Sequence, residues 1–364
     1  MEIYYNFQTK LWECNEKQMY WGLNQPLIYS SSSLSTPLQF SLNQKNNQLG
    51  PLIGVLTGRN ANNELTGSGP LFRHLQETIL KYQGSTVVFT MEDVHGEKLT
   101  GYMYQPTKNR WYEVNAPLPQ LIFNRLPFEL NDSERFEDFS KFCNRKKIPI
   151  LHPFFLDIQQ IDSLFLSSIN VKKHMPIIKN IQSKLDFIKT LHLLKEMYII
   201  PKNSYQKKEL LLIQLTTSSH LIVTRYNKQR AFTSFDSFFY EYDYLFYHFP
   251  MFTRQYIPPT EQFTILIHPQ QKKKVTAIHW NEYTKPSMRT EQFIRYIVPN
   301  ILQLLNKIST QWIEFAIEIT IFKNNYYITD FQFKPLYTDN FEIEERRMES
   351  LTRIFLEKTL FTYS

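Results

Sequence analysis

The sequence predicts a protein of mixed α/β and α+β architecture in three parts: a small β-rich N-terminal segment (residues 1–50), a doubly wound domain (51–152) and a larger α+β half (153–364). In the second part, apolar runs alternate with amphipathic helical patterns, as in βαβ units with a buried parallel sheet. Beyond them, helical patterns alternate with pairs of strand patterns, as in α+β domains. Aromatic residues make up 15% of the chain, which favours thick, sheet-rich cores.

The N-terminal segment alternates apolar and polar residues over 1–30, which predicts two or three short strands. Residues 30–50 are rich in Ser, Asn and Gln, and this composition predicts turns or a linker. The first part is therefore expected to be a short β module joined to the next domain by a polar connection.

The second part contains a βαβ unit followed by a further strand and helix. The expected elements are a strand at 52–56, a helix at 70–82, a strand at 86–90, a strand at 121–123 and a helix at about 132–145. The strand at 52–56 is a continuous apolar run, which is typical of a strand buried on both faces. This pattern predicts a small doubly wound domain.

The third part alternates helices with strand pairs. Helices are expected at 157–168, 182–196, 290–308 and 342–360, strands at 197–200, 210–216, 220–226, 263–268 and 274–282, and a hairpin at 312–334. Pro299 is expected to kink the third of these helices or divide it in two. The aromatic stretch 235–252 is interpreted as core and subdomain interface, with an exposed docking patch as the alternative.

Composition narrows the protein class. The net charge of +7 is compatible with a solvated basic surface or with weak binding to polyanions, but the lysines are scattered, so nucleic acid is not an expected partner. Cys14 and Cys143 provide neither a disulfide framework nor metal-ligand spacing. We expect no signal peptide and no membrane span, and therefore a cytoplasmic protein.

Acidic residues face one another across the predicted C-terminal hairpin. If residue 322 pairs with 326, Glu318 lies opposite Asp330, and Gln332 lies two residues further along the same face. Opposed carboxylates repel, and a divalent cation between them would take carboxylate and amide oxygens as ligands. Glu318, Asp330 and Gln332 are thus candidate metal ligands. The alternative is a solvent-facing polar stripe.

Four segments carry a resemblance to a known family. They are Gly54–Arg59, Gly67–Arg73, Phe123–Pro127 and Ile148–Phe155. In order and spacing they are similar to the YheC/YheD family, endospore coat-associated proteins with an ATP-grasp domain, and the two-part layout is closest to the YheC branch. The resemblance extends over roughly residues 50–335. It implies that 51–152 is a pre-ATP-grasp-type domain and that 153–364 is ATP-grasp-like, with two α+β subdomains.

The resemblance also implies what a working site would contain. ATP-grasp enzymes hold ATP between two subdomains, neutralise its phosphates with cationic side chains and carry Mg²⁺ on carboxylates. Ile200, Thr264 and Asn281 stand at three positions where the family has basic residues, and the loop 203–208 lacks the glycine of a phosphate-binding flap. Glu318, Asp330 and Gln332 correspond to the family's metal ligands with altered reach. ATP and Mg²⁺ binding are therefore expected to be weakened.

The leading hypothesis is a catalytically impaired binding or scaffold protein in spore formation, without catalytic residues. It would be located in the mother-cell cytoplasm and at the spore coat, with other coat or family proteins as partners. Arg59, Arg73 and Arg125 could then bind an anion or a carboxylate near the N-terminus of the helix at 70–82. Alternatively, these residues only build the βαβ turn and the domain junction.

A second hypothesis is an active ATP-dependent carboxylate–amine ligase that modifies a spore protein or peptide. In this case Lys202, Lys207 or Lys208 would replace the missing phosphate-binding lysine. A third hypothesis, based on net charge alone, is a surface that binds polyanions.

Overall fold

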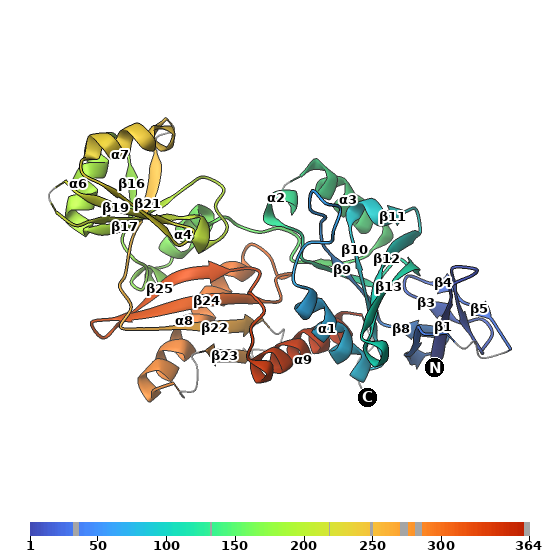
Figure 1. Cartoon of the computed structure of the whole chain (residues 1–364). Helices are drawn as coiled ribbons and strands as arrows, with labels where there is room; N and C mark the ends of the chain where they lie inside the picture. Colours follow the sequence, from blue (N-terminus) through green and yellow to red (C-terminus); the bar gives the residue numbers. More distant parts are fainter. Residues whose placement is uncertain are drawn as a thin grey trace. The chain divides into compact units, whose positions relative to one another are not determined.

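The computed structural model describes residues 1–31, 36–131, 133–217, 219–247, 250–269 and 286–359, and the backbone of 276–280. The chain forms two compact units. Unit 1 comprises Met1–Phe155, Gln311–Ile313 and Leu336–Ser364, and unit 2 comprises Leu156–Thr310 and Glu314–Pro335. The division differs from the predicted boundaries, because the C-terminal helix α9 (Phe341–Lys358) packs into the core of unit 1 rather than into the half that precedes it (Figure 1).

Two small sheets make up the N-terminal segment of unit 1. The strands are β1 (Glu2–Asn6), β2 (Leu11–Cys14), β5 (Ile28–Tyr29) and β6 (Gln39–Ser41) in the order β5-β2-β1-β6, and β3 (Tyr20–Trp21), β4 (Gln25–Pro26), β7 (Asn43–Lys45) and β8 (Gln48–Gly50) in the order β4-β3-β8-β7. The predicted β-rich segment is confirmed. Of the turns or linker predicted at 30–50, residues 39–50 instead form the paired strands β6, β7 and β8 with turns between them. Phe40 and Leu49 point into the core, and pairing with β1 and β3 holds their strands.

The main sheet of unit 1 has the order β11-β12-β10-β9-β14-β15, and β13 pairs with β12. Its strands are β9 (Leu52–Leu56), β10 (Ser85–Phe89), β11 (Val94–His95), β12 (Lys98–Gln105), β13 (Arg110–Pro117), β14 (Leu121–Asn124) and β15 (Ile150–Leu151); the helices are α1 (Gly69–Lys81), α2 (Phe128–Asn131) and α3 (Glu134–Lys146). β10, β9, β14 and β15 run parallel, so the predicted βαβ unit is confirmed. The antiparallel strands β11 to β13 extend the sheet at the β10 side.

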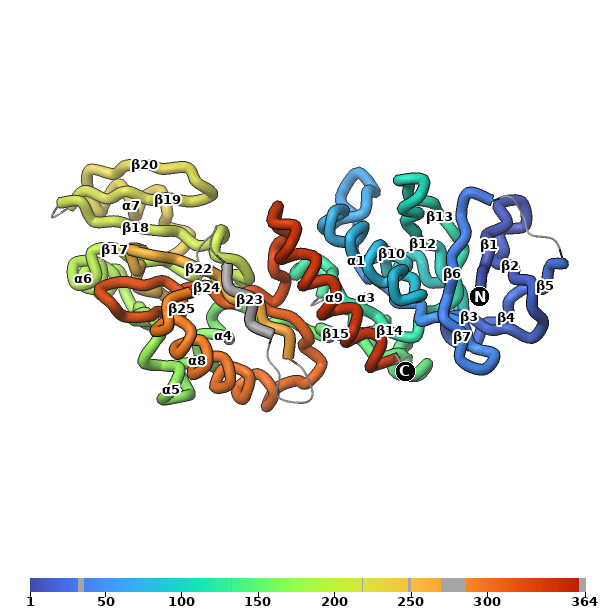
Figure 2. The backbone as a smooth tube through the Cα atoms, turned by 90° about the horizontal axis from the view of Figure 1, so that it is seen from below, coloured from blue at the N-terminus to red at the C-terminus, as the bar shows by residue number. Residues whose placement is uncertain are grey.

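Both faces of this sheet are covered. Leu71, Leu75 and Ile79 of α1 pack with Leu351 and Phe355 of α9 on one face, and the two helices lie side by side in both ribbon views (Figures 1 and 2). The opposite face packs against α3 and the N-terminal segment. Complete coverage explains why β9 and β10 consist of buried residues only.

The first part of unit 2 is a six-stranded antiparallel sheet in the order β16-β21-β17-β18-β19-β20. The strands are β16 (Ile178–Ile181), β17 (Glu196–Ile200), β18 (Leu211–Leu215), β19 (Leu221–Arg225), β20 (Lys228–Phe232) and β21 (Met251–Gln255), with helices α6 (Lys184–Leu194) and α7 (Phe235–Glu241). Phe238 and Phe246 are buried in its core, which confirms the core part of that interpretation of the aromatic stretch. The tyrosines of the same stretch, Tyr240, Tyr244 and Tyr247, are exposed.

The second part of unit 2 is a four-stranded sheet in the order β23-β22-β24-β25. The strands are β22 (Glu261–His268), β23 (Thr276–Trp280), β24 (Phe315–Phe322) and β25 (Asn325–Gln332), with helices α4 (Ile158–Leu166), α5 (Ile169–Lys172) and α8 (Met288–Asn306). The helix α8 continues through Pro299 and is not divided by it. Short 3₁₀ turns occur at η1 (Met91–Asp93), η2 (Pro106–Lys108), η3 (Lys207–Glu209) and η4 (Asp243–Phe246).

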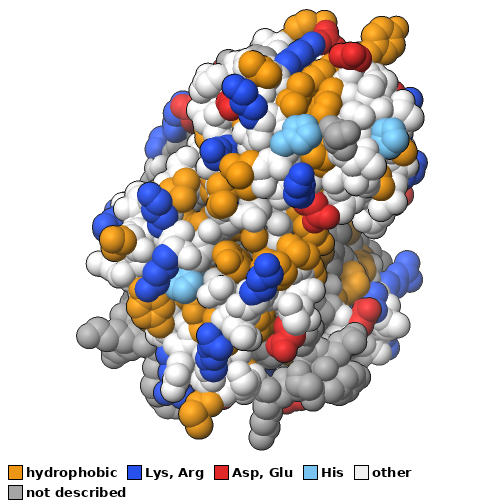
Figure 3. Space-filling view, turned by 90° about the vertical axis from the view of Figure 1, so that its left-hand side faces the viewer, with side chains coloured by type: hydrophobic (Ala, Val, Ile, Leu, Met, Phe, Trp, Pro, Cys, Tyr) orange, Lys and Arg blue, Asp and Glu red, His pale blue; other side chains and the backbone are white. Residues whose placement is uncertain are grey.

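The surface shows no gathered basic tract on the face drawn in Figure 3, where Lys and Arg side chains are spread among uncharged and apolar ones. This distribution gives no support to the polyanion hypothesis on that face. None of the helices in the described ranges combines the length and the hydrophobicity needed to cross a lipid bilayer.

Candidate functional site

A β-bulge shapes the acidic hairpin of unit 2. At the turn, Phe322 pairs with Asn325 and not with residue 326 as the sequence predicted. The register then shifts between Glu318 and Ile319, so that Glu318 faces Asp330, as predicted. Thr329 is the extra residue of the bulge, and its hydroxyl lies on the same face as the acid pair.

Glu318 is already paired with a cation from the protein itself. Its Oε1 lies 2.5 Å from Nζ of Lys207, which belongs to the turn η3 between β17 and β18. The same oxygen accepts a hydrogen bond of 2.8 Å from the Thr329 hydroxyl. Both side chains of the ion pair are largely buried, at 29% exposure for Lys207 and 17% for Glu318. Lys207 thus provides positive charge at the position where the resemblance implies a metal ion.

Asp330 is almost fully enclosed, with 5% exposure. Burial raises the pKa of its carboxyl group to about 6, and the negative charge of Glu318 adds to the shift. A hydrogen bond of 2.9 Å from Gln332 Nε2 and the charges of Lys207 and Arg254 offset only part of this effect. The third candidate ligand, Gln332, therefore directs its amide nitrogen at Asp330.

A buried ion pair between Arg254 and Asp162 is hydrogen-bonded to the backbone of the bulge. Arg254 of β21 forms two hydrogen bonds with the carboxylate of Asp162 on α4, one of them of 3.1 Å from Nε. Its third donor binds the backbone oxygen of Thr329 at 3.1 Å. The residues are separated by 92 positions in the chain. The sequence alone does not indicate this pair, because neither residue belongs to a local pattern that predicts the contact.

A small cavity lies beside the hairpin. It has a volume of about 130 Å³, and it is lined by Pro176, Tyr198, Lys207, Arg254, Gln255, Tyr256, Ile257, Pro259, Gln262, Thr320 and Thr329. Burial, followed by the neighbouring Tyr256 and Glu318, raises the pKa of the Tyr198 phenol, which therefore stays protonated at neutral pH. The cavity is smaller than the roughly 300 Å³ at which pockets for small-molecule ligands begin.

Of the positions where the resemblance implies basic residues, Ile200 and Thr264 carry no positive charge. Ile200 is buried in an apolar cluster with Ile158 and Leu210. Thr264 of β22 is the cross-strand neighbour of Glu318, so an arginine at this position would lie on the same face as the acid pair. Asn281 lies outside the described residues.

The lysine-bearing loop after β17 is held by its own hydrogen bonds. The amide of Tyr205 donates to the Glu209 carboxylate at 2.8 Å, and the carbonyl of Ser204 accepts from the amide of Ile158 at 2.8 Å. Lys202 and Lys208 are exposed. Of the three candidate lysines, the structure therefore brings Lys207 to the acid pair.

The three candidate arginines of unit 1 each lie against a different neighbour. Arg59 forms an ion pair with Asp93, with 3.1 Å between Nη2 and both carboxylate oxygens. The guanidinium groups of Arg73 and Arg125 lie over the rings of Tyr104 at 5.1 Å and Phe123 at 5.5 Å. These contacts favour a structural role over a shared anion site.

The contacts of the loop before α1 also favour a structural role over an anion site. Gly67 has φ of +95°, and a Cβ there would lie 2.8 Å from the Phe72 ring. The hydroxyl of Ser68 caps the helix by accepting from the amide of Leu71, and Pro70 has no amide hydrogen to donate. Packing and capping account for this segment without a bound anion.

The predicted metal ligands Glu318 and Asp330 are not joined by a third His, Cys, Asp or Glu side chain that the structure describes. Where the structure describes side chains, no three His, Cys, Asp or Glu residues gather as they would around a metal ion. Glu318 and Asp330 are brought together as predicted, but only as a pair.

Unit 2 contains two sheets with helices packed on them, and the Lys207–Glu318 pair lies on the hairpin of the second sheet. This is an ATP-grasp-like α+β fold, so the predicted fold class is confirmed. D-alanine–D-alanine ligase from Bacillus anthracis, solved in complex with ATP, is 10% identical with a TM-score of 0.50, over 86% of this chain and 97% of that one. N5-carboxyaminoimidazole synthetase from Staphylococcus aureus is 12% identical with a TM-score of 0.49, over 85% and 77%. A RiPP-associated ATP-grasp ligase from Chryseobacterium gregarium is 11% identical with a TM-score of 0.41, over 84% and 97%.

These likenesses concern the fold. No protein-family model and no curated protein matches the chain.

The arrangement in unit 2 does not fit Mg²⁺ and ATP as it stands. A metal ion on Glu318 would have to displace the Lys207 ammonium group, and Gln332 would have to turn its amide oxygen towards the ion. A nucleotide would need more space than the cavity beside the hairpin provides.

Proposed function

We propose that the chain is a non-catalytic ATP-grasp-like protein that acts by binding partners. The observation that carries the proposal is the contact of 2.5 Å between Lys207 and Glu318, which balances the charge of Glu318 from within the protein. In an enzyme of this fold, the carboxylates would have to remain available for the cation that accompanies the nucleotide. An internal ammonium group on Glu318 competes with that cation.

The absence of positive charge at Ile200 and Thr264 also supports a non-catalytic protein. A charge-assisted hydrogen bond contributes roughly 1.5–3 kcal/mol, so the absence of two at Ile200 and Thr264 would weaken nucleotide binding by about two to four powers of ten. Ile200 is packed into an apolar cluster, which leaves no space for a charged side chain at that position.

The biological setting of the proposal comes from the YheC/YheD resemblance in residues 54–73 and 123–155. It supports a role in spore formation, with the protein made in the mother cell and associated with the spore coat, where other coat or family proteins are its partners. In a sporulating cell, a fluorescent fusion is expected to collect around the forespore. An even distribution through the mother cell would contradict this part of the proposal.

The alternative is an active ATP-dependent carboxylate–amine ligase in which Lys207 moves from Glu318 to a phosphate group. Isothermal titration calorimetry with Mg-ATP separates the two functions. We expect no heat of binding at millimolar nucleotide for the unaltered chain, and the same for Glu318→Gln and Asp330→Asn. Micromolar affinity in the unaltered chain that is lost in these variants would overturn the non-catalytic proposal and leave the ligase as the alternative. Lys207→Met is the informative partner variant: it should permit weak binding of Mg²⁺ if Lys207 occupies a former cation site.

A further inference from the structure

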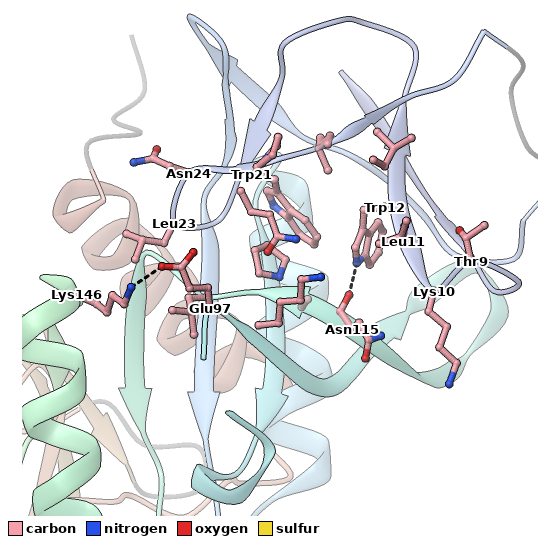
Figure 4. Close-up of a pocket in the computed structure, with 18 residues that line it drawn as sticks. Thr9, Lys10, Leu11, Trp12, Trp21, Leu23, Asn24, Glu97, Asn115 and Lys146 are labelled. Carbon is pink, nitrogen blue, oxygen red and sulfur yellow. Dashed lines mark hydrogen bonds and ion pairs between the residues drawn. The ribbon is translucent and has the colours of Figure 1, made fainter. Parts of the chain in front are cut away.

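A large pocket lies in unit 1, apart from the acidic hairpin. Its volume is about 670 Å³, within the range of roughly 300–1,000 Å³ that is typical of small-molecule sites. Its lining includes Lys10, Trp12, Trp21, Leu27, Glu97 and Lys98 (Figure 4). The N-terminal segment provides one side of the pocket, and the hairpin of β12 and β13 with the end of α3 provides the other.

The walls of the pocket are fixed by contacts between these two sides. The indole Nε1 of Trp12 donates to the carbonyl of Asn115 at 2.9 Å, as the dashed line in Figure 4 shows. The amide of Leu23 donates to the carbonyl of Leu118 at 2.7 Å. The rings of Trp12 and Trp21 meet edge to face at 4.8 Å. The pocket is therefore a preformed apolar cavity with an aromatic wall.

The charged residues of the pocket are mostly cationic. Glu97 is paired with Lys146 at 2.6 Å, at the opposite side of the pocket from Lys10 (Figure 4). Lys10 and Lys98 form no ion pair with any residue that the structure describes. An excess of positive charge beside apolar walls suits a ligand that carries negative charge.

A buried donor in the wall adds a second polar feature. Trp21 is fully buried, and within the described ranges its indole Nε1 has no hydrogen-bond acceptor. Such unsatisfied buried donors are rare in native proteins. Because this atom has almost no accessible surface, it adds polarity to the wall but offers no hydrogen bond to a ligand in the pocket.

We propose that this pocket binds a small amphipathic anion: an aromatic or short aliphatic body with one carboxylate or sulfonate group. The body lies against Trp12, Trp21 and Leu27, and the anionic group is neutralised by Lys98 and, at the rim, by Lys10. The site is separate from the acid pair, so it does not depend on whether unit 2 binds ATP.

The test uses two probes with the same body. 8-Anilinonaphthalene-1-sulfonate carries the anionic group, and N-phenyl-1-naphthylamine lacks it. Both are titrated by calorimetry and fluorescence into the full chain and into Lys98→Gln, Lys10→Gln/Lys98→Gln and the control Lys108→Gln, an exposed lysine of η2 outside the pocket. Thermal unfolding checks that each variant is folded.

We expect the sulfonate to bind at one site per chain, several times more tightly than the neutral probe, and more weakly as NaCl is added. Because partly exposed ion pairs are weak, the single variant should lose about two- to fivefold in affinity, the double variant more, and the control nothing. Equal binding of the two probes, equal loss in the control, or many non-saturating sites would overturn the proposal. If a variant fails to fold, the ratio of the two probes' affinities for the unaltered chain still tests the need for the anionic group.

Discussion

Asp330→Asn should make unit 2 more stable at neutral pH. The carboxyl group of Asp330 has a pKa of about 6 in the folded protein against 3.8 in a model compound. Its protonated form is therefore favoured by folding, and its contribution to stability is complete below pH 3.8 and is lost as the pH rises through 6. The asparagine is uncharged at every pH and keeps the size and shape of the side chain.

The structure sets the magnitude of this effect. A difference of about two pKa units corresponds to about 3 kcal/mol, and the low exposure of Asp330 means that little of it is screened by solvent. The variant should thus be more stable than the unaltered chain by up to about 3 kcal/mol at pH 7, and equal to it near pH 4.

Guanidinium unfolding followed by circular dichroism at several pH values between 4 and 7 measures this difference. Comparing the two proteins at each pH removes the contribution of all other titrating groups. Glu318→Gln is a second check, because removing the neighbouring charge should lower the pKa of Asp330 and flatten the pH dependence. A stability difference that does not change between pH 4 and pH 7 would refute the reasoning.

Three further predictions concern other parts of the structure. Arg254→Ala should cost about 3–5 kcal/mol in unfolding free energy by leaving Asp162 buried without its partner, whereas Arg254→Met with Asp162→Leu should cost much less. Gly67→Ala should cost more than about 1 kcal/mol, because its φ is +95°, while Gly69→Ala, with no atom near its Cβ, should be neutral or slightly stabilising; thermal unfolding compares them. Burial raises the pKa of Cys143 to about 12, so a thiol reagent at pH 8 should modify it only after denaturation; rapid labelling of the native chain would contradict this.

The elements that the sequence predicts well are those whose pattern is local. The βαβ unit at 52–90 is one example, since its apolar runs are buried on both faces and its helix has a clear stripe. The strands at 39–50 were missed because each has few apolar residues, and their pairing with β1 and β3 depends on contacts distant in the chain. The position of α9 was missed for the same reason.

In the candidate site, the sequence correctly predicts that Glu318 lies opposite Asp330, but it does not predict the strand register that places them there. The assumed turn register was off by one residue, and the bulge at Thr329 corrects the pairing before the acid pair is reached. Lys207 was one of three candidate lysines, and no local pattern distinguishes it from the other two. Only the fold of the loop after β17 selects it.

The position of α9 has a consequence for synthesis of the chain. Ribosomes synthesise a protein from its N-terminus to its C-terminus. The face of the unit 1 sheet that contains Ile53 and Val55, however, is covered by residues 348–355, which are synthesised near the end. All of unit 2 must leave the exit tunnel before that face is covered. The first unit to be translated is therefore the last to be completed, and its exposed apolar strands are open to chaperones while the second unit folds.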